Sequence, residues 1–533
     1  MHKATLMNPL TIAGVTLATA GVLLFFQLGH YALWDDEVGL AVPAKQVWLT
    51  GETSVVAGEN IMVPRQGIIV KALKDLANPP LPAFVLAPFA GGNDANPFIL
   101  RFPFALCGLL CVGLLLMGAF LSKAPPRLLI ILAIGIIGNV SIFLYFRQVR
   151  YYGTAILLST AATFLYLFLK KRPTHLLVFS LLLSGVLASS YMVFAAFAAA
   201  LVLDCVIWQK HEFKFGWGVR SICLLAPLFL ISGLVLLKWN PYATGIKTQA
   251  ATNTLWDKAM LLWWNLRDIN ANEFGSLLLI LLSPLAYLSG IKNPWLWRGP
   301  LAVIVYCLVL ALVSPQPVNL TSVADVRYAA PLIPLLIVIT AVLLWRLTAK
   351  MSLGIALGIS MLIFWTNLLN TVIWFQDKPH STLLNYLKEL VSPPAEPFTP
   401  TAKWIQEHVQ KGRSVWVLPE YMTYPLMFHA PNATYAWQLR PEQKQEEQFK
   451  NLPDIHFQGL VPPDYIVAFG PSVQQIRQLI GQWSMQGLRY QEVTRLMTFW
   501  KDLYRPELFW RTFKPIENFD PNTEAIYIFK RQP

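Results

Sequence analysis

Long apolar runs separated by short polar segments occupy the first 375 residues of the chain. Each run approaches the length of about 20 apolar residues that an α-helix needs to cross a lipid bilayer. The pattern predicts a polytopic α-helical membrane module over residues 1–375, with about 11 transmembrane helices. The first run could be a secretory signal, but it extends to Phe26, beyond the small residues Ala18-Thr19-Ala20, so we interpret it as an uncleaved helix. The predicted helices are Leu10–Gly29, Pro97–Leu121, Leu128–Phe146, Tyr151–Leu169, Leu176–Ser189, Tyr191–Trp208, Ser221–Leu237, Phe274–Ile291, Leu301–Ser314, Tyr328–Trp345 and Ser352–Phe375.

After residue 375 the apolar runs become short and polar residues become frequent. Residues 376–400, which include the proline-rich segment Ser392-Pro393-Pro394, read as a linker. Residues 401–533 read as a soluble α/β domain that is large enough to bury one core. Its predicted strands are Ser414–Leu418, Asp464–Phe469 and Ala525–Phe529, and its predicted helices are Thr401–Gln410 and Pro471–Gln486.

A long loop, residues 30–96, follows the first predicted helix. Loops of this length inside a compact module are usually functional. Apolar spacing predicts amphipathic helices on the membrane surface at Val38–Leu49 and Ile61–Leu76. Thr254–Arg267, which is rich in tryptophan, is a third segment of this kind.

Composition and charge agree with a membrane protein. Hydrophobic residues make up 55% of the chain, charged residues only 13%, and the mean hydropathy is +0.48, which excludes an ordinary soluble enzyme or a disordered protein. The net charge of +13 does not indicate nucleic-acid binding, because no basic domain with interleaved aromatic residues is present. Cations instead gather in alternate short loops, which places the N-terminus in the cytoplasm and the C-terminal domain outside. These loop cations are Lys123, Arg127, Lys170, Lys171, Arg172, Lys210, Lys214, Arg220, Lys292, Arg298, Arg346 and Lys350.

Three adjacent carboxylates, Asp35, Asp36 and Glu37, come shortly after the first predicted helix, at the outer surface. Adjacent carboxylates repel one another, so the cluster indicates either a functional role or the N-terminus of a helix, where Asp is a favourable cap. A carboxylate in this place suits a general base that removes a proton from a hydroxyl group.

Arginines lie on the same outer side, where the positive-inside rule disfavours them. Arg101 lies near the start of the second predicted helix, Arg147 and Arg150 lie between the third and fourth, and Arg327 precedes the tenth. A guanidinium group matches the oxygens of phosphate, so these residues indicate an anionic ligand; snorkelling or pairing with loop acids is the alternative. Phosphate at the outer leaflet implies a lipid phosphate, and the combination predicts group transfer from a lipid-linked donor.

Four motifs follow one another along the chain: Asp36-Glu37 with a small-residue helix after it, Pro79-Pro80-Leu81, Arg101-Phe102-Pro103, and Arg327-Tyr328 with Pro331 and Pro334. In this order the first 350 residues or so resemble the GT-C glycosyltransferases that use polyprenyl-phosphate sugars. The similarity is to the aminoarabinose transferases of lipid A and the protein O-mannosyltransferases. It implies a GT-C type membrane module with an extracytoplasmic C-terminal α/β domain, in a bacterial inner membrane.

The resemblance also implies roles for single residues. Asp36 is expected to be the catalytic base, with Asp35 and Glu37 in the same catalytic group and Glu37 shaping the loop. The expected partners are a polyprenyl-phosphate sugar donor and a lipid, glycan or protein acceptor. No cofactor is expected; the acids could bind a divalent metal, but the resemblance implies metal-independent transfer, and no metal ligand is assigned. The candidate substrate-binding residues are Arg101, Arg147, Arg150, Arg327, Tyr328, Tyr151 and Lys74, with Lys71 as a weaker candidate.

One position departs from the family pattern. Some GT-C enzymes carry a second acid just after the third helix, where this chain reads Arg150-Tyr151-Tyr152-Gly153-Thr154. Asp268 or Glu273 in a later loop could replace that acid, unless the reaction does not need it.

Two other functions share the membrane architecture. A glycan ligase or oligosaccharide transferase would move a preassembled glycan, and the size of the transferred group distinguishes it from a transferase of single sugars. A lipid or sugar transporter is less favoured, because transporters show related halves and ionisable residues near mid-membrane. In this chain the ionisable residues gather at the outer surface and no internal repeat is visible.

Overall fold

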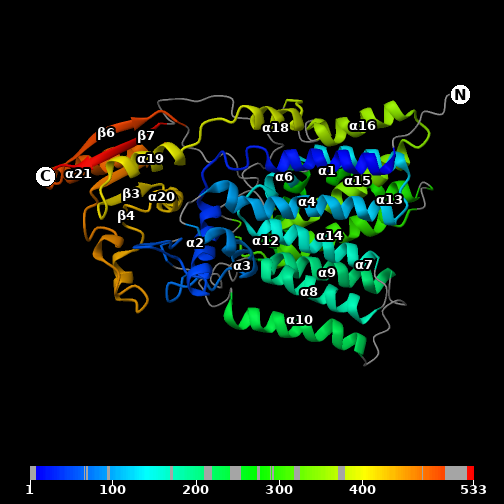
Figure 1. Cartoon of the computed structure of the whole chain (residues 1–533), viewed down its shortest axis with the longest axis horizontal. Helices are drawn as coiled ribbons and strands as arrows, with labels where there is room; N and C mark the ends of the chain where they lie inside the picture. Colours follow the sequence, from blue (N-terminus) through cyan, green and yellow to red (C-terminus); the bar gives the residue numbers. More distant parts are fainter. Residues whose placement is uncertain are drawn as a thin grey trace.

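The computed structural model describes residues 8–64, 66–67, 70–92, 96–168, 172–208, 219–240, 254–272, 276–288, 290, 293–316, 318, 325–369, 378–470, 472–498 and 525–533. The molecule is elongated, with a helical bundle at one end and an α/β domain at the other (Figure 1). Helices α2 (Asp35–Thr50) and α3 (Leu81–Ala90) lie between the two parts. The first outer loop is therefore placed where the bundle meets the α/β domain.

Every predicted apolar run of the bundle overlaps a helix of the structure. Among the described residues, four helical segments are long and apolar enough to cross a membrane, and a bent pair adds a fifth if it counts as one span. Seven further apolar helices contain 10–17 residues, so the number of spans stays a prediction. The bundle helices are α1 (Pro9–Phe25), α4 (Pro97–Leu121), α5 (Pro126–Gly138), α6 (Val140–Phe146), α7 (Tyr151–Leu167), α8 (Pro173–Ser189), α9 (Tyr191–Trp208), α10 (Val219–Lys238), α12 (Leu255–Asn272), α13 (Ser276–Leu288), α14 (Trp295–Val313), α15 (Ile333–Leu347) and α16 (Leu353–Trp365).

The bent pair is α5 and α6, which meet at an angle of 55°. Asn139 stands at the break, and its side-chain oxygen accepts the backbone N–H of Ile142 at 3.0 Å. This N-cap satisfies a donor that the break exposes inside the bundle. Helix α6 lies at the end of the bundle that faces the α/β domain (Figure 1), and Arg147 and Arg150 follow it in the chain.

The first outer loop is only partly as predicted. The helix expected at Val38–Leu49 is confirmed as α2, but the helix expected over Ile61–Leu76 is wrong. That stretch begins in the hairpin of β1 (Val56–Ala57) and β2 (Asn60–Ile61) and continues as turns. Positive φ angles at Gln66, Gly67, Ala72 and Leu73 are incompatible with a right-handed helix. The second helix of the loop is α3, whose residues Leu81–Ala90 include Pro82 and Pro88.

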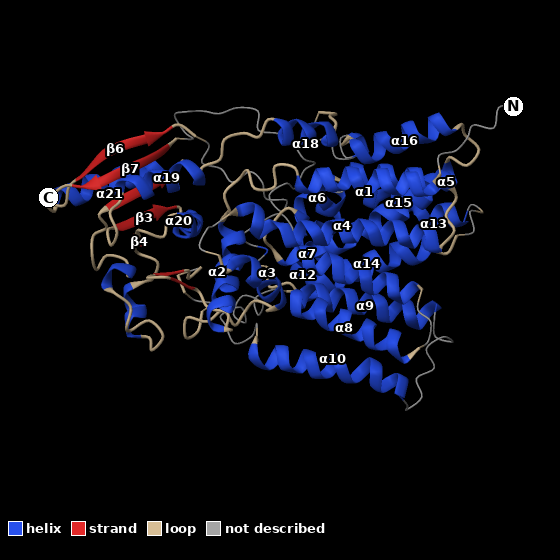
Figure 2. Ribbon diagram, viewed as in Figure 1, coloured by secondary structure: helices blue, strands red, loops and turns tan. Residues whose placement is uncertain are grey.

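The C-terminal domain contains a five-stranded mixed sheet in the order β4-β3-β5-β7-β6 (Figure 2). Strand β3 (Ser414–Leu418) is parallel to β4 (Thr434–Tyr435) and β5 (Tyr465–Phe469), and β7 (Ile526–Arg531) is antiparallel to β5 and β6 (Tyr490–Leu496). The three predicted strands are confirmed as β3, β5 and β7, and the two predicted helices as α19 (Phe398–His408) and α21 (Ser472–Met485). Strands β4 and β6 and the short helix α20 (Thr423–His429) were not predicted from the sequence.

The first outer loop and the C-terminal domain share one hydrophobic core. Val38 and Ala41 of α2 and Val63 of the loop belong to the same buried cluster as Val415 and Phe469 of the sheet. The side-chain amide of Asn60 donates to the Ala433 carbonyl at 2.9 Å and accepts the Tyr435 N–H at 2.8 Å. Asn60 thus pairs with the edge strand β4 as a neighbouring strand would. Burial and these bonds attach the loop to the domain.

The range predicted as a linker holds a helix, α18 (Thr382–Val391). Tyr386 on its buried face donates to the Leu23 carbonyl of α1 at 3.0 Å, while Leu384 and Val391 on the other face are exposed. An amphipathic helix of this kind is typical of a membrane interface. Burial raises the pKa of Glu389 on this helix to about 8, an effect that nearby Arg147 opposes.

A histidine of the C-terminal domain contacts the start of the loop, and we expect it to make stability depend on pH. The Leu33 N–H donates to His429 Nε2 at 2.9 Å, and burial, reinforced by Arg101, lowers the pKa of His429 from 6.5 to about 4. Between these two pH values the unfolded chain binds a proton here and the folded chain does not, so stability should fall as the pH falls through this window.

Thermal unfolding of the purified protein at pH 7 and pH 4.5 checks this expectation. His429→Gln keeps a side-chain acceptor but cannot be protonated, so its Tm should change less between the two pH values. Equal changes in Tm for the variant and the wild type would contradict the role of His429.

Candidate functional site

The three adjacent carboxylates form the first turn of α2 and point in different directions. Negative charge at a helix N-terminus is favourable, because it interacts with the helix dipole. Asp35 lies near the C-terminal domain, where it adds to burial and Glu420 in raising the pKa of Tyr424. Glu37 turns into the core, and Asp36 turns toward the end of the bundle. Helix geometry and separate partners therefore relieve the repulsion that the sequence suggests.

Glu37 is fully buried and forms a bidentate ion pair with Arg101. Arg101 Nε and Nη2 lie 2.8 and 2.5 Å from the two carboxylate oxygens of Glu37. The same guanidinium donates to the carbonyls of Leu28, Tyr31 and Ala32, while Glu37 also accepts the Val149 N–H at 2.9 Å. The pair therefore fastens the segment before α2 to α4 and to the turn after α6. These contacts indicate a structural role for Glu37 and Arg101, both of which are candidate site residues in the sequence.

Asp36 lies between two arginines that come from distant parts of the chain. Asp36 Oδ2 is 3.0 Å from Arg327 Nη1 and 3.2 Å from Arg150 Nη2. Arg150 also donates to the backbone carbonyl of Asp36 at 3.0 Å, and Arg327 pairs with Asp325 at 2.6 Å. The Asp36 side chain remains 32% exposed. Two carboxylates and two guanidinium groups thus form a cluster without formal net charge, with Asp36 accessible at its centre.

Two aromatic candidates lie beside this cluster. The rings of Tyr151 and Tyr328 stack with centroids 5.7 Å apart. The Arg150 guanidinium lies 5.6 Å from the Tyr151 ring centroid, and the Arg327 guanidinium lies 5.6 Å from the Tyr328 ring centroid. Flat rings against guanidinium planes limit the conformations of both arginines. The structure therefore brings together Asp36, Arg150, Arg327, Tyr151 and Tyr328.

Two other cationic candidates lie outside this group. Arg147 donates to the carbonyls of Leu23, Leu24 and Phe26, and so caps the C-terminal end of α1. Lys74 pairs with Glu52 at the surface of the loop. The protein's own carbonyl and carboxylate groups thus satisfy the charges of Arg147 and Lys74, and no bound anion is needed to explain them.

A cavity of about 330 Å³ opens beside Arg150, Tyr151 and Tyr328, and we call it the outer cavity. Gly39, Leu40 and Pro43 of α2 line it, and their spacing places them on the helix face that also carries Asp36. Its other walls include Asp75 and Asn78 from the loop and Ser189 and Ser190 from the junction of α8 and α9. Its volume lies in the range of small-molecule sites.

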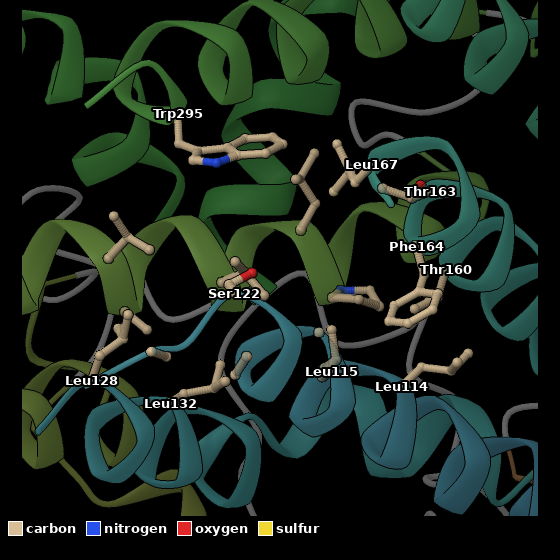
Figure 3. Close-up of a pocket in the computed structure, with 18 of the residues that line it drawn as sticks. Leu114, Leu115, Ser122, Leu128, Leu132, Thr160, Thr163, Phe164, Leu167 and Trp295 are labelled. Carbon is tan, nitrogen blue, oxygen red and sulfur yellow. The ribbon is translucent and has the colours of Figure 1, made fainter. Parts of the chain in front are cut away.

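An apolar cavity of about 290 Å³, which we call the inner groove, runs between α4, α5, α7 and α15 (Figure 3). Leu114, Leu132, Phe164 and Leu167 are among its lining residues. The 3₁₀ helix η3 (Val326–Leu332) joins the two spaces, because it contributes Tyr328 to the outer cavity and Pro331 to the inner groove. Residues three apart lie on one face of a 3₁₀ helix, so the same face of η3 contributes to both spaces.

Of the two acids that could replace the second acid, the structure describes only one. Asp268 is buried and pairs with its neighbour Arg267 at 2.6 Å, and Glu273 lies outside the described residues. The wall of the outer cavity contains another acid, Asp75, together with Ser189. Sequence reasoning did not single out either residue, although Asp75 stands only three positions before the motif Asn78-Pro79-Pro80. Within the described part of the chain, no group of three or more His, Cys, Asp or Glu side chains could hold a metal ion.

No protein-family model matches the sequence, and no curated protein matches it either. Solved structures do match the fold. ArnT from Cupriavidus metallidurans bound to undecaprenyl phosphate has a TM-score of 0.60 and 13% sequence identity, covering 97% of this chain and 97% of that chain. The apo state of the same ArnT has a TM-score of 0.56 with the same identity and coverage. The resemblance to GT-C enzymes, inferred from four short motifs, is thereby confirmed for the fold. An oligosaccharyltransferase from Archaeoglobus fulgidus matches with a TM-score of 0.43, which is too low to establish a common fold.

Loss of the buried ion pair should destabilise the protein. Glu37→Gln is expected to lower the free energy of unfolding by about 3–5 kcal/mol, because Arg101 would remain buried without a full counter-charge. Glu52→Gln is the matched control: it removes a carboxylate from the exposed pair with Lys74 in the same loop and should have little effect. Thermal unfolding in detergent measures the stability of both variants. Equal Tm values for Glu37→Gln and Glu52→Gln would contradict the stabilising role of Glu37.

Proposed function

We propose that the protein is an integral membrane glycosyltransferase that moves a sugar from a polyprenyl-phosphate donor to a hydroxyl or phosphate group of an envelope acceptor. The observation that carries the proposal is the position of Asp36. This carboxylate lies between Arg150 and Arg327, beside the junction of a polar-walled cavity and an apolar groove. A donor with a lipid tail, a phosphate and a sugar needs these three environments in this order.

The phosphate of the donor is assigned to Arg150 and Arg327. Each guanidinium presents a planar set of donors that matches phosphate oxygens. Both groups contact Asp36, so an arriving phosphate competes with Asp36 for them. Binding of the donor thereby loosens the contacts that hold the carboxylate. The positive charges then remain with the leaving phosphate while Asp36 turns to the acceptor.

The lipid tail is assigned to the inner groove. Leucines, Phe164 and Val338 line the groove, with few polar groups (Figure 3). A polyprenyl chain can pass from the bilayer onto such a surface without exposure to water, and it gains van der Waals contacts there. ArnT, which shares the fold, has been solved with undecaprenyl phosphate bound, and this supports a polyprenyl-phosphate ligand for this chain.

Transfer then requires one displacement at the sugar carbon that carries the phosphate. Asp36 accepts the proton of the acceptor hydroxyl, and the acceptor oxygen forms the new bond to carbon. The bond between that carbon and the phosphate oxygen breaks, and its electron pair leaves with polyprenyl phosphate, which Arg150 and Arg327 stabilise. A single displacement inverts the configuration of the sugar carbon. No nucleotide sugar, metal ion or other cofactor enters these steps.

The site is proposed to face the outer side of a bacterial inner membrane, with the N-terminus in the cytoplasm. The support is the distribution of loop cations along the sequence, which gather in alternate loops and, by the positive-inside rule, assign the loop that carries Asp36 to the other side of the membrane. Lipid A, a glycan or a protein would each supply a suitable acceptor group on that side.

Removal of the proposed base should abolish turnover without unfolding the protein. Asp36→Asn is expected to slow the release of polyprenyl phosphate by about 10²–10⁴-fold, the usual contribution of general base catalysis. The assay supplies purified protein with a panel of polyprenyl-phosphate monosaccharides and an envelope extract, and mass spectrometry identifies the product. Unchanged turnover in Asp36→Asn would remove Asp36 from the reaction. Absence of release by the folded wild-type protein from every donor would refute the proposed function.

Filling the inner groove should weaken the use of long-chain donors. Val338→Trp places a large side chain in the groove and is expected to raise the KM for an undecaprenyl-phosphate sugar by about tenfold or more, with a smaller change for a short-chain analogue. Leu230→Trp on α10 is the matched control, because Leu230 is exposed on the outside of the bundle. If the ratio of the KM values for the long-chain and short-chain donors were the same in Val338→Trp as in Leu230→Trp, the groove would be excluded as the tail site.

A further inference from the structure

Polar groups without protein partners line the outer cavity. Ser189 is fully buried, and neither its hydroxyl nor that of Tyr151 has a hydrogen-bond partner within the described part of the chain. Buried hydroxyl groups are nearly always hydrogen-bonded in folded proteins, so two of them in one cavity indicate a ligand that supplies the missing bonds.

Asp75 adds a carboxylate to the same wall. Its side chain accepts the backbone N–H of Asn78 at 3.2 Å and the side-chain amide of Asn78 at 2.9 Å. Among the described residues it forms no ion pair, whereas Asp36, Glu37 and Glu52 each contact a cation. Burial raises the pKa of Asp75, with the Asn78 bonds opposing the rise. The carboxylate is partly buried and has no counter-charge among the described residues, and it can still accept hydrogen bonds from a ligand.

Helix α2 forms another part of this wall. Pro43 lies inside the helix and lacks the N–H that would donate to the carbonyl of Gly39, four residues earlier. Both residues line the outer cavity. The wall therefore combines a carboxylate and two hydroxyl groups. This set accepts several hydrogen bonds from one small molecule and offers hydroxyl donors in return, which suits a sugar.

We propose that the outer cavity binds a sugar ring, with Asp75 accepting hydrogen bonds from its hydroxyl or amino groups and with Ser189 and Tyr151 completing the set. The inference rests on the proposed function and extends it by naming the residues that select the sugar. The ring enters from either the donor or the acceptor, since both carry the same hydrogen-bonding groups. Asp75 is a binding residue in this scheme, and Asp36 remains the base.

The test compares binding of two lipids to the full-length protein in detergent. Binding of undecaprenyl phosphate tests the phosphate and tail sites alone. Binding of a panel of undecaprenyl-phosphate pentoses, hexoses and amino sugars tests the site for the sugar ring as well. Asp75→Asn keeps the shape and the turn with Asn78 but removes the charge. It is expected to weaken binding of the preferred sugar lipid by about 10- to 100-fold while leaving the bare lipid unchanged. Glu52→Gln, which removes a carboxylate outside the cavity, should change neither affinity.

The outcomes separate the two sources of the ring. A selective loss for the sugar lipid assigns the ring to the donor. Unchanged donor affinity with a KM for the acceptor raised by a similar factor, at nearly constant kcat, assigns it to the acceptor. The inference would be overturned if Asp75→Asn had the wild-type affinity for the sugar lipid and the wild-type KM for the acceptor. If this variant does not fold, Ser189→Val and Tyr151→Phe carry the same comparison.

The inference can fail separately from the proposed function. Turnover by the wild-type protein tests the function, whereas the difference in affinity between sugar lipid and bare lipid tests the cavity. If the wild type releases no polyprenyl phosphate, the function is refuted and the affinity difference alone decides the role of Asp75. If the wild type turns over and Asp75→Asn binds and reacts like it, the function stands and the cavity assignment is refuted.

Discussion

The ion pair between Glu37 and Arg101 is the constraint on which the arrangement of the site depends. It joins α2, α4 and the turn that carries Arg150, and it does so in a region from which water is excluded. An ion pair of this kind contributes little net stability by itself, but it tolerates very few geometries because every donor must be satisfied. Asp36 is the neighbour of Glu37, so the geometry that fixes the buried carboxylate also fixes the accessible one.

The C-terminal domain is a second support for the same helix. Val38 and Ala41 of α2 pack into the cluster that contains the sheet residues Val415 and Phe469, and Asn60 pairs with the edge strand. The face of α2 with Asp36, Gly39 and Pro43 is left to the outer cavity and the arginines. One short helix is therefore held by the membrane bundle at its first turn and by the soluble domain along its buried face.

Periodicity predicted the bundle helices well, because long apolar runs have few alternatives in a membrane protein. It failed at Ile61–Leu76, where apolar residues belong to a loop that is buried by a domain more than 300 positions away along the chain. The sequence placed Asp36 and four arginines together at the outer surface, but it could not separate Arg150 and Arg327, which contact Asp36, from Arg101 and Arg147, which contact other protein groups. Asp75 and Ser189 could not be predicted as site residues from the sequence, because they line a cavity that three distant segments form together.

The shared core also has a consequence for biosynthesis. Leu33 and His429 are 396 positions apart, and strand β7, which lies between β5 and β6 in the sheet, comes at the very end of the chain. At a synthesis rate of about 5–20 residues per second, the first outer loop leaves the ribosome roughly 20–80 seconds before strand β7 of the α/β domain is made. During this time α2 can pack only against the bundle. An unfinished chain therefore holds α2 without the hydrophobic core that the loop shares with the C-terminal domain.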